Sequence, residues 1–433
     1  MSVVSILYTG QSGLSSHGDA IGIVGDNIAN ANTVGYKGSR ANFEDVLARS
    51  LGSGGPGDIG MGSRLASVQK ILTQGALLGT GVSTDLAIKG DGFFVVKGEV
   101  DGLAGNFYTR AGQFHLDADG KLTNDNGLVV QGYGVDAQGN IIKNVTDLQV
   151  GTSNIPPSAT TAANMVGNLD SNATTPANPF SLTDPTGTSN FSTSMTVYDS
   201  LGNAHSVNVF FRQEAAAGTW TWNALVDGGD TTGGTGAGTW ESIASGTLTF
   251  DTQGRLDTEV NGAASVDFVG ATPGQAITFD FGDSITTDGG SGLTGMTNYA
   301  GPSTINFMDQ DGYASGALTS ISIDTDGMIS GIFSNGQQQA VGQVLLADFQ
   351  NAQDLQRTGG NLFVETQKSG AALIGEATQG GRGSINAGAL EQSNVDLAKE
   401  FVDMIAFQRG FQSSSKTIQT ADMLLQEVIG LKR

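Results

Sequence analysis

Apolar positions near both ends of the chain follow a helical period. Close to the N-terminus they recur at spacings of seven, three or four residues, which is typical of a coiled-coil helix. These positions are Leu7, Leu14, His17, Ile21, Val24 and Ile28. Near the C-terminus a seven-residue repeat runs through Leu397, Phe401, Met404, Phe411, Ile418 and Leu425, with Gln408, Ser415 and Asp422 at the remaining seam positions. We expect one helix over most of residues 3–30 and a longer one after a capping box at Ser393 and Asp396.

The predicted N-terminal helix is rich in glycine, with Gly10, Gly13, Gly18, Gly22 and Gly25 inside it. Each glycine costs about 1 kcal/mol of helix stability relative to alanine. The segment alone should therefore be disordered, and it should fold where neighbouring helices supply stability. Glycine also lets two backbones approach closely, which suits a packed helix pair.

Between the ends, short alternating segments bounded by turn residues predict β-strands. The clearest segments are 92–96, 128–130, 195–198, 206–212, 219–226 and 277–281. The composition agrees, because 65 glycines and many Thr, Ser, Asn and Asp residues are typical of short strands joined by tight turns. The expected fold is mainly β and multi-domain, with an α-helical coiled-coil domain formed by the N- and C-terminal segments.

A change of composition indicates an inserted domain. Residues 166–300 hold all three tryptophans, fourteen acidic residues, two arginines and no lysine. We expect them to form an inserted outer β-domain, with the first β-domain on both sides of it. The full expected division is a helical domain of 1–30 and 394–433, an extended connecting region of 31–85 and 368–393, a first β-domain of 86–165 and 301–367, and the insertion 166–300.

Charge is concentrated in the middle of the chain, although the net charge is −22 overall. Residues 1–75 carry five acids and five bases, and residues 376–433 carry seven acids and six bases. Nearly neutral ends can pack against copies of themselves, while an acidic body stays solvated. The acidic balance argues against nucleic acid as a partner.

The sequence predicts neither a membrane span nor a cleaved leader. No apolar run approaches the roughly 18 residues that a span needs. The first eighteen residues carry no lysine or arginine and are interrupted by polar residues, unlike a secretory signal. We therefore expect any export to proceed without a cleaved signal peptide.

No set of residues predicts catalysis, a cofactor or a metal. Cysteine is absent, so a thiolate nucleophile, a thiolate ligand and a disulfide are excluded. His17, His115 and His205 fall in different predicted elements, and no nucleophile-elbow sequence accompanies them. We expect a protein that is not an enzyme.

A pattern of an acid, a turn residue, a glycine and an apolar residue recurs along the chain. Calcium would need several carboxylates and a closing bidentate glutamate, which these segments lack. The pattern instead predicts β-hairpin turns in which Asp and Gly supply the positive φ. The segments begin at Asp117, Asp136, Asp251 and Asp324, and we interpret Asp309, Asp311 and Gly312 in the same way.

Two runs of residues, one near each end of the chain, form recognisable signatures. The N-terminal run, residues 26–37, contains Asn27, Asn30, Asn32, Thr33, Gly35, Tyr36 and Lys37. The C-terminal run, residues 388–416, contains Ser393, Asn394, Val395, Asp396, Gln408 and Arg409. Both runs resemble signatures of the flagellar rod, hook and hook-associated axial protein family, and residues 90–96, 311–316 and 342–363 are similar to core-domain segments of the same family. The resemblance thus covers the chain except residues 166–300.

The resemblance implies a structural subunit whose paired terminal helices line a tube, with β-domains facing outward. The length of the insertion favours the hook over the shorter distal-rod proteins. The hook would be a flexible curved tube that transmits torque from rod to filament. Implied partners are the chain itself as a helical homopolymer, the rod, hook cap and hook–filament junction proteins, and the flagellar type III export apparatus. The implied location is the extracellular flagellum.

Two other interpretations remain open at this point. Within the family, the chain could be a distal-rod or hook-associated axial subunit. From another class, a secreted β-rich adhesin would use Trp220, Trp222 and Trp240 to stack on a glycan. An adhesin has no need of helical ends.

Overall fold

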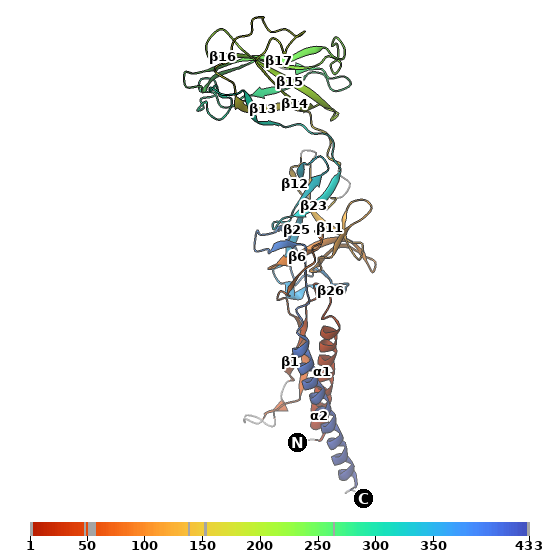
Figure 1. Ribbon diagram of the computed structural model, residues 1–433. Helices are drawn as coiled ribbons and strands as arrows, with labels where there is room; N and C mark the ends of the chain where they lie inside the picture. Colours follow the sequence, from red (N-terminus) through yellow and green to blue (C-terminus); the bar gives the residue numbers. More distant parts are fainter. Residues whose placement is uncertain are drawn as a thin grey trace. The chain divides into compact units, whose positions relative to one another are not determined.

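The computed structural model describes residues 3–46, 49–50, 58–136, 139–150, 154–262 and 265–430. The chain divides into two compact units, coloured by sequence in Figure 1. The first unit comprises Met1–Thr152, Thr319–Ile332 and Gln338–Arg433. The second comprises Ser153–Leu318 and Phe333–Gln337. Most of the regular structure is strand, and the two α-helices of the described chain lie near its ends, which confirms the mainly β fold class.

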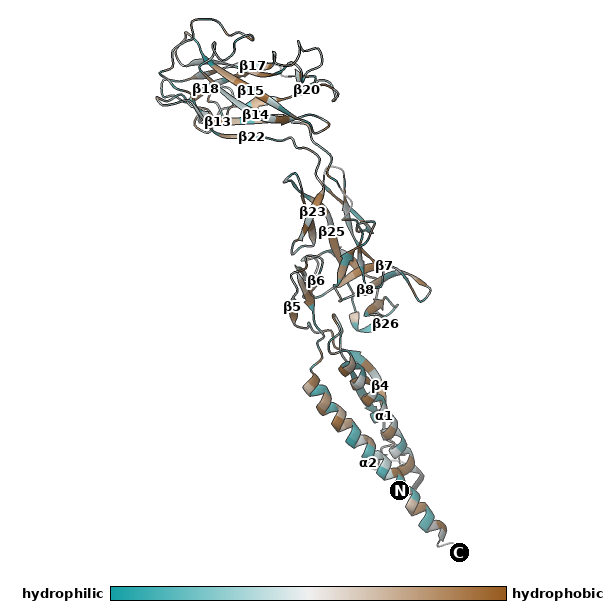
Figure 2. Cartoon of the chain, turned by 45° about the vertical axis from the view of Figure 1, so that its right-hand side comes forward, coloured by the Kyte–Doolittle hydropathy of each residue, from teal (hydrophilic) through white to brown (hydrophobic). Residues whose placement is uncertain are grey.

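The first unit contains α1 (Val3–Ala29) and α2 (Leu397–Gly430), which pack side by side in opposite directions (Figures 1 and 2). The strands β1 (Ser39–Asp45) and β4 (Ser63–Lys70) form an antiparallel hairpin that packs on α1. The start of α2 differs from the predicted capping box. Asp396 Oδ1 accepts the N–H groups of Ala398 and Lys399, so Asp396 is the cap rather than Ser393.

Over its described residues, neither helix combines the length and the apolar character that a membrane span requires.

Twelve strands of the first unit form one sheet, ordered β23-β24-β25-β11-β7-β8-β27-β26 with four more at its sides. Phe93, Tyr108, Phe349 and Phe363 pack edge to face in its core. The strands are β7 (Phe93–Val100), β8 (Leu103–Thr109), β9 (Phe114–Leu116), β10 (Leu122–Asn124), β11 (Val129–Val135), β12 (Ile141–Asp147), β23 (Leu318–Ile323), β24 (Met328–Phe333), β25 (Gln338–Asp348), β26 (Gln356–Gly359), β27 (Leu362–Val364) and β28 (Leu373–Glu376).

Three short strand pairs complete this unit. They are β2 (Arg49–Ser50) with β3 (Asp58–Ile59), β5 (Leu77–Gly79) with β30 (Ala389–Glu391), and β6 (Leu86–Lys89) with β29 (Ser384–Ala387). The last two pairs join the region before the large sheet to the region just before α2. The segments predicted as extended connections, 31–85 and 368–393, therefore contain paired strands.

The second unit is built from a five-stranded antiparallel sheet and a three-stranded sheet around one core. The first sheet holds β14 (Phe191–Tyr198), β15 (Ala204–Gln213), β16 (Thr219–Asp227), β17 (Trp240–Phe250) and β18 (Leu256–Asn261). The second holds β13 (Ala162–Asn168), β21 (Thr278–Asp280) and β22 (Thr304–Gln310), and β19 (Ser265–Val266) pairs with β20 (Gln275–Ala276). Trp220 and Trp222 are buried in the core, so they cannot offer the glycan-stacking surface that an adhesin would use.

The second unit is longer than the predicted insertion of 166–300. The strands β13 and β22 pair with each other, and Ala163 and Met165 belong to the same core as Trp222. The predicted boundary at 166 therefore falls inside β13, and the predicted boundary at 300 falls just before β22. Composition shows where the acidic, tryptophan-containing sequence begins, whereas pairing between strands about 140 residues apart leaves no local signal.

Four of the Asp and Gly segments form hairpin turns, as predicted. In the turn between β9 and β10, Asp117 Oδ1 accepts the N–H groups of Asp119 and Lys121, and Gly120 has φ +74°. Corresponding turns follow β11, β17 and β23; Gln138 lies outside the described residues. Asp311 is different, because its carboxylate accepts the N–H groups of Thr161 and Ala162 at 2.7 and 3.0 Å. It therefore caps the start of β13 instead of turning a hairpin.

Candidate assembly site

Glycines bring α1 and α2 into close contact at two positions. A Cβ atom on Gly10 would lie 2.8 Å from Cγ1 of Ile418, and one on Gly13 would lie 2.7 Å from Oγ of Ser414. A larger residue at either position would require the facing side chain or the helix to shift. By contrast, a Cβ on Gly25 would meet no atom of the described chain within 4 Å. The close-approach explanation therefore holds for Gly10 and Gly13 but not for every glycine of α1.

An aromatic cluster joins α1, α2 and β1. The His17 ring centre lies 6.3 Å from that of Phe43 on β1 and 6.2 Å from that of Phe407 on α2, and the two phenylalanines meet edge to face at 6.0 Å. Gly410 leaves room for the imidazole, because a Cβ there would lie 2.6 Å from it. Sequence periodicity placed His17 on a seam but gave no signal for Phe43, Phe407 or Gly410.

The other seam residues differ in how far they are covered. Val24 is buried, and Leu7, Leu14, Ile21, Ile28, Met404, Phe411, Ile418 and Leu425 are half-buried. Leu397 and Phe401 remain 42% and 51% exposed. The filler positions Gln408 and Asp422 are exposed as well. At the start of α2, the predicted seam residues Leu397 and Phe401 therefore do not pack against α1.

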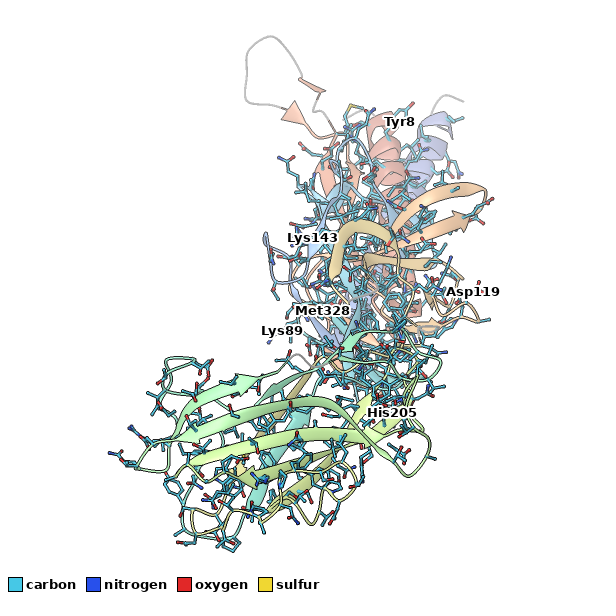
Figure 3. The ribbon with its side chains drawn as sticks, turned by 90° about the horizontal axis from the view of Figure 1, so that it is seen from above. Tyr8, Lys89, Asp119, Lys143, His205 and Met328 are labelled. Carbon is cyan, nitrogen blue, oxygen red and sulfur yellow. The ribbon has the colours of Figure 1, made fainter. Side chains whose placement is uncertain are left out.

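The uncovered side of α2 is apolar towards both ends of the helix. Val402 is 66% exposed, and Ile405, Met423 and Leu424 are also exposed. Figure 2 shows apolar residues along both helices, and Figure 3 shows Tyr8 of α1. Exposed apolar side chains that gather in this way are typical of surfaces that contact another molecule.

The N-terminal signature forms the end of α1 and the turn after it. Asn27 is buried and exchanges two hydrogen bonds with the backbone of Ser39, at 2.7 and 2.9 Å. The Tyr36 hydroxyl donates to Asp26 Oδ2 at 2.9 Å. Burial and this hydrogen bond raise the pKa of Tyr36 to about 12. Gly35 has φ +68°, and a Cβ there would lie 2.4 Å from the backbone nitrogen of Ala111, so only glycine fits.

Three buried charged side chains connect this turn to the segment before α2. Lys37 Nζ lies 2.6 Å from Glu391 Oε1, and Arg110 Nη1 lies 3.4 Å from Glu391 Oε2. Lys37 also donates to the Thr73 carbonyl, and Glu391 accepts the N–H of Gly75. Burial lowers the pKa of Lys37, while the attraction of Glu391 opposes this shift. A buried charge is stable only when paired in this way.

The C-terminal signature divides between this junction and the open side of α2. Asn394 accepts the N–H of Gly38 and donates to the carbonyls of Ile71 and Thr73, so it ties the start of α2 to the region after α1. Ser393 and Val395 are half-buried beside it. Gln408 and Arg409 lie away from it and are exposed. We define the helix junction as Asn27, Gly35, Tyr36, Lys37, Arg110, Glu391 and Asn394.

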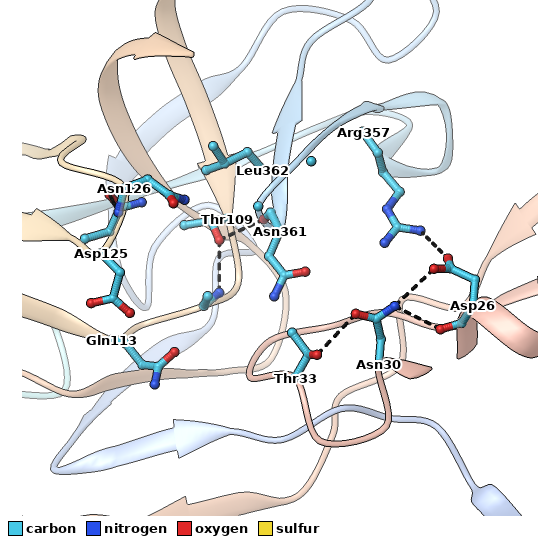
Figure 4. Close-up of a pocket in the computed structure, with 14 residues that line it drawn as sticks. Asp26, Asn30, Thr33, Thr109, Gln113, Asp125, Asn126, Arg357, Asn361 and Leu362 are labelled. Atoms are coloured by element: carbon cyan, nitrogen blue, oxygen red, sulfur yellow. Dashed lines mark hydrogen bonds and ion pairs between the residues drawn. The ribbon is translucent and has the colours of Figure 1, made fainter. Parts of the chain in front are cut away.

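A polar cavity of about 480 Å³ opens beside the helix junction (Figure 4). Asn30 donates to Asp26 and accepts from Thr33, and Arg357 pairs with Asp26 at 3.3 Å. Asn361, which has φ +58°, donates to the carbonyl of Val34. These signature side chains therefore stabilise the turn itself. Asn32 is exposed.

Among the residues that the structure describes, no group of three or more His, Cys, Asp or Glu side chains is arranged to hold a metal ion.

Family models match the chain in four consecutive segments. Flagella basal body rod protein matches residues 7–37, and Flagellar hook protein FlgE/F/G D1 domain matches 87–161. Flagellar basal body protein FlaE D2 domain matches 168–313, and Flagellar basal body rod FlgEFG protein C-terminal matches 386–431. Each of the four segments contains residues of the helix junction or of the second unit described above.

Relatives that match over nearly the whole length are flagellar hook proteins. Flagellar hook protein FlgE of Treponema pallidum (strain Nichols) is 36% identical over 468 residues, covering 99% of each chain. Flagellar hook protein FlgE of Salmonella typhimurium (strain LT2) is 35% identical, covering 97% of this chain and 98% of the relative. The crystal structure of Helicobacter pylori flagellar hook protein FlgE2 covers 73% of this chain and 100% of its own, with 16% identity and a TM-score of 0.48. Identity at this level across the full length shows that the chain belongs to the flagellar hook protein family.

Proposed function

We propose that this protein is a structural subunit of the bacterial flagellar hook and that it polymerises through its two terminal helices. The observation that carries the proposal is the exposed apolar side of α2, which includes Phe401, Val402, Ile405 and Met423. Burying such a row against another chain is favourable by about 25 cal/mol per Å² of apolar surface. The helix junction supports the proposal, because its buried contacts hold the end of α1 and the start of α2 together.

In the assembled hook, α1 and α2 form the wall of the inner tube and the β-rich parts face outward. The charge pattern supports this arrangement. The ends of the chain are close to neutral, so they can pack against copies of themselves, whereas Ser153–Leu318 holds sixteen acidic residues against two arginines. An acidic outer surface resists sideways association of finished polymers. The second unit then tunes the curvature and bending stiffness of a tube that passes torque from rod to filament.

The family context supports further partners. The chain would contact rod, hook cap and hook–filament junction proteins, and it would be exported through the flagellar type III apparatus. Its place would be the extracellular hook. Catalysis has no part in this function, since a hook subunit acts by its shape and its contacts.

A sedimentation assay with electron microscopy tests the proposal. The full chain should form tubes on concentration, and Ile405→Asp should prevent this while leaving the monomer folded, because Ile405 is exposed in the single chain. Val260→Asp is the matched control, since Val260 is similarly exposed but lies on β18 of the second unit. Normal tubes from the Ile405 variant, or no tubes from the unaltered chain, would contradict the proposal.

A further inference from the structure

The uncovered side of α2 carries cations at its centre. Exposed residues follow one another at spacings of three and four, which places them on one face. We call this face the outer α2 row: Val402, Ile405, Arg409, Gln412, Lys416, Gln419 and Met423. Its charged members, Arg409 and Lys416, are both cationic, and the side chain of neither forms an ion pair or hydrogen bond within the described chain. The row is apolar at its ends and basic in the middle.

The uncovered side of α1 carries the opposite charge. Exposed residues with the same spacing form the outer α1 row: Tyr8, Gln11, Ser15, Asp19, Gly22, Asp26 and Ala29. Its charged members are both acids, and residues 1–36 contain no lysine or arginine. Asp26 is already bound to Arg357 and Tyr36. Asp19 has no bonded partner in the described part of the chain and is therefore the acid available to another molecule.

Asp19 and Arg409 lie at the same height along the helix pair. The helices run in opposite directions, with Gly10 against Ile418, Gly13 against Ser414 and His17 against Gly410. Counting two residues on from His17 along α1 therefore leads to the level of residues 408 and 409 on α2. Each copy thus presents a free carboxylate on one row and a free guanidinium on the other, at one level.

We propose that the outer α2 row of one copy docks on the outer α1 row of a second copy, with Arg409 of the first paired to Asp19 of the second. This inference rests on the proposed function and names the contact between subunits. A second copy is the occupant that the charges favour. Contact between two outer α2 rows would bring cations together, and contact between two outer α1 rows would bring carboxylates together. Only contact between an outer α2 row and an outer α1 row joins opposite charges.

The mixed contact also has the geometry that a polymer needs. Each copy uses two different surfaces, so docking on one side leaves the other side free for the next copy. Such head-to-tail contacts build rings or open helices, in contrast to a two-fold contact, which stops at a dimer. Lys416 lies seven residues beyond Arg409, which is about 10 Å along the helix axis. Docking of two copies at the same height pairs Asp19 with Arg409, whereas a copy shifted by that distance would pair Asp19 with Lys416 instead.

A charge exchange tests the pairing on the purified full chain. The variants are Asp19→Arg, Arg409→Asp and the two together, and the measurement is the critical concentration for polymerisation. Each single change should raise it about tenfold, because it places like charges in contact. The double variant should return close to the unaltered value. Lys416→Asp is the matched control, and combining it with Asp19→Arg should give no recovery.

Cysteine pairs give a second measurement that needs no loss of assembly. The chain has no cysteine of its own, so Asp19→Cys and Arg409→Cys can be made in separate proteins, mixed, assembled and oxidised. Disulfide dimers should form in the mixture and not in polymers of either variant alone. Dimers equally frequent with Lys416→Cys, single variants that polymerise normally, or a double variant without recovery would overturn the pairing. Failure of the unaltered chain to polymerise would instead overturn the proposed function.

Discussion

Lys37 and Glu391 form a buried ion pair with 2.6 Å between Nζ and Oε1, although 354 residues separate them in the chain. Lys37 lies eight residues after the end of α1, and Glu391 lies six residues before the start of α2. Their side chains are 1% and 0% exposed. The pair therefore joins the segment that follows α1 to the segment that precedes α2. It helps to fix where the two helices leave the β-rich part of the first unit.

Removing Lys37 should destabilise the first unit strongly. Lys37→Met leaves Glu391 buried with only Arg110 as a charged partner, and breaking a buried pair in this way costs about 3–5 kcal/mol. Urea unfolding of the full chain measures the loss. Lys143→Met is the control, because its ion pair with Glu376 is on the surface and its loss should leave the midpoint nearly unchanged. Equal midpoints for the Lys37 variant and the unaltered chain would show that the pair does not hold the junction.

A large side chain at Gly10 should separate the helices, while the same side chain at Gly25 should not. Gly10→Leu places atoms where even a Cβ would lie 2.8 Å from Ile418, and overpacking of this kind costs about 1–3 kcal/mol. Gly25→Leu has open space at Cβ and gains helix propensity. Circular dichroism at 222 nm should show less helix on heating for Gly10→Leu and more for Gly25→Leu. Identical melting of the two variants would refute the close contact.

The tyrosine at the junction should make the fold sensitive to alkali. The pKa of Tyr36 is raised from 10.0 to about 12 in the folded chain, first by burial and then by its hydrogen bond to Asp26. The unfolded chain therefore loses this proton first, so the stabilisation is complete below pH 10 and is lost as the pH rises through 12. The lowered pKa of Lys37 makes the folded chain more stable as the pH rises, which is the opposite effect. The contribution of Tyr36 must therefore be measured separately, with a variant.

Tyr36→Phe provides that comparison. The difference in unfolding free energy between the unaltered chain and the variant should shrink between pH 10 and pH 12 and stay constant between pH 7 and pH 9. Urea midpoints at each pH measure it. A difference that is constant up to pH 12 would mean that Tyr36 does not titrate as described.

The second unit should be removable between two stretches that the structure pairs with each other. Ile155 and Gly316 exchange backbone hydrogen bonds, as do Ser158 and Tyr313, so these two stretches lie side by side. Replacing residues 159–312 with a short Gly and Ser linker should leave the first unit folded and able to form tubes of altered curvature or stiffness. Replacing 166–300 instead removes most of the core of the second unit but keeps β22 and most of β13, which pack on that core.

The two deletions can be compared directly by solubility, melting and electron microscopy. The shorter deletion should expose apolar side chains such as Met165 and aggregate. Equal solubility and melting of the two deleted chains would contradict the assignment of β13 and β22 to the second unit. Tubes with unchanged curvature and stiffness from the longer deletion would argue against a mechanical role for the second unit.

Local chemistry was enough to predict the elements that depend on near neighbours in the chain. The helical period of Leu7 to Ile28 predicts α1, because side chains three and four residues apart share one helix face. The Asp117 to Gly120 turn is equally local, since its carboxylate bonds to backbone groups two and four residues on. The signature residues were also found in the sequence, but their division between the junction and the open side of α2 was not.

Only the tertiary structure decided which distant residues meet. Nothing near Arg110 in the sequence indicates Glu391, and nothing near Phe43 indicates Phe407, because such contacts depend on how whole elements pack. The same holds for β13 and β22, whose pairing sets the ends of the second unit. The sequence by itself therefore determined the elements, the turns and the family, through interactions within a few residues. Packing and the pairing of buried charges across hundreds of residues decided the helix junction and the outer rows of α1 and α2.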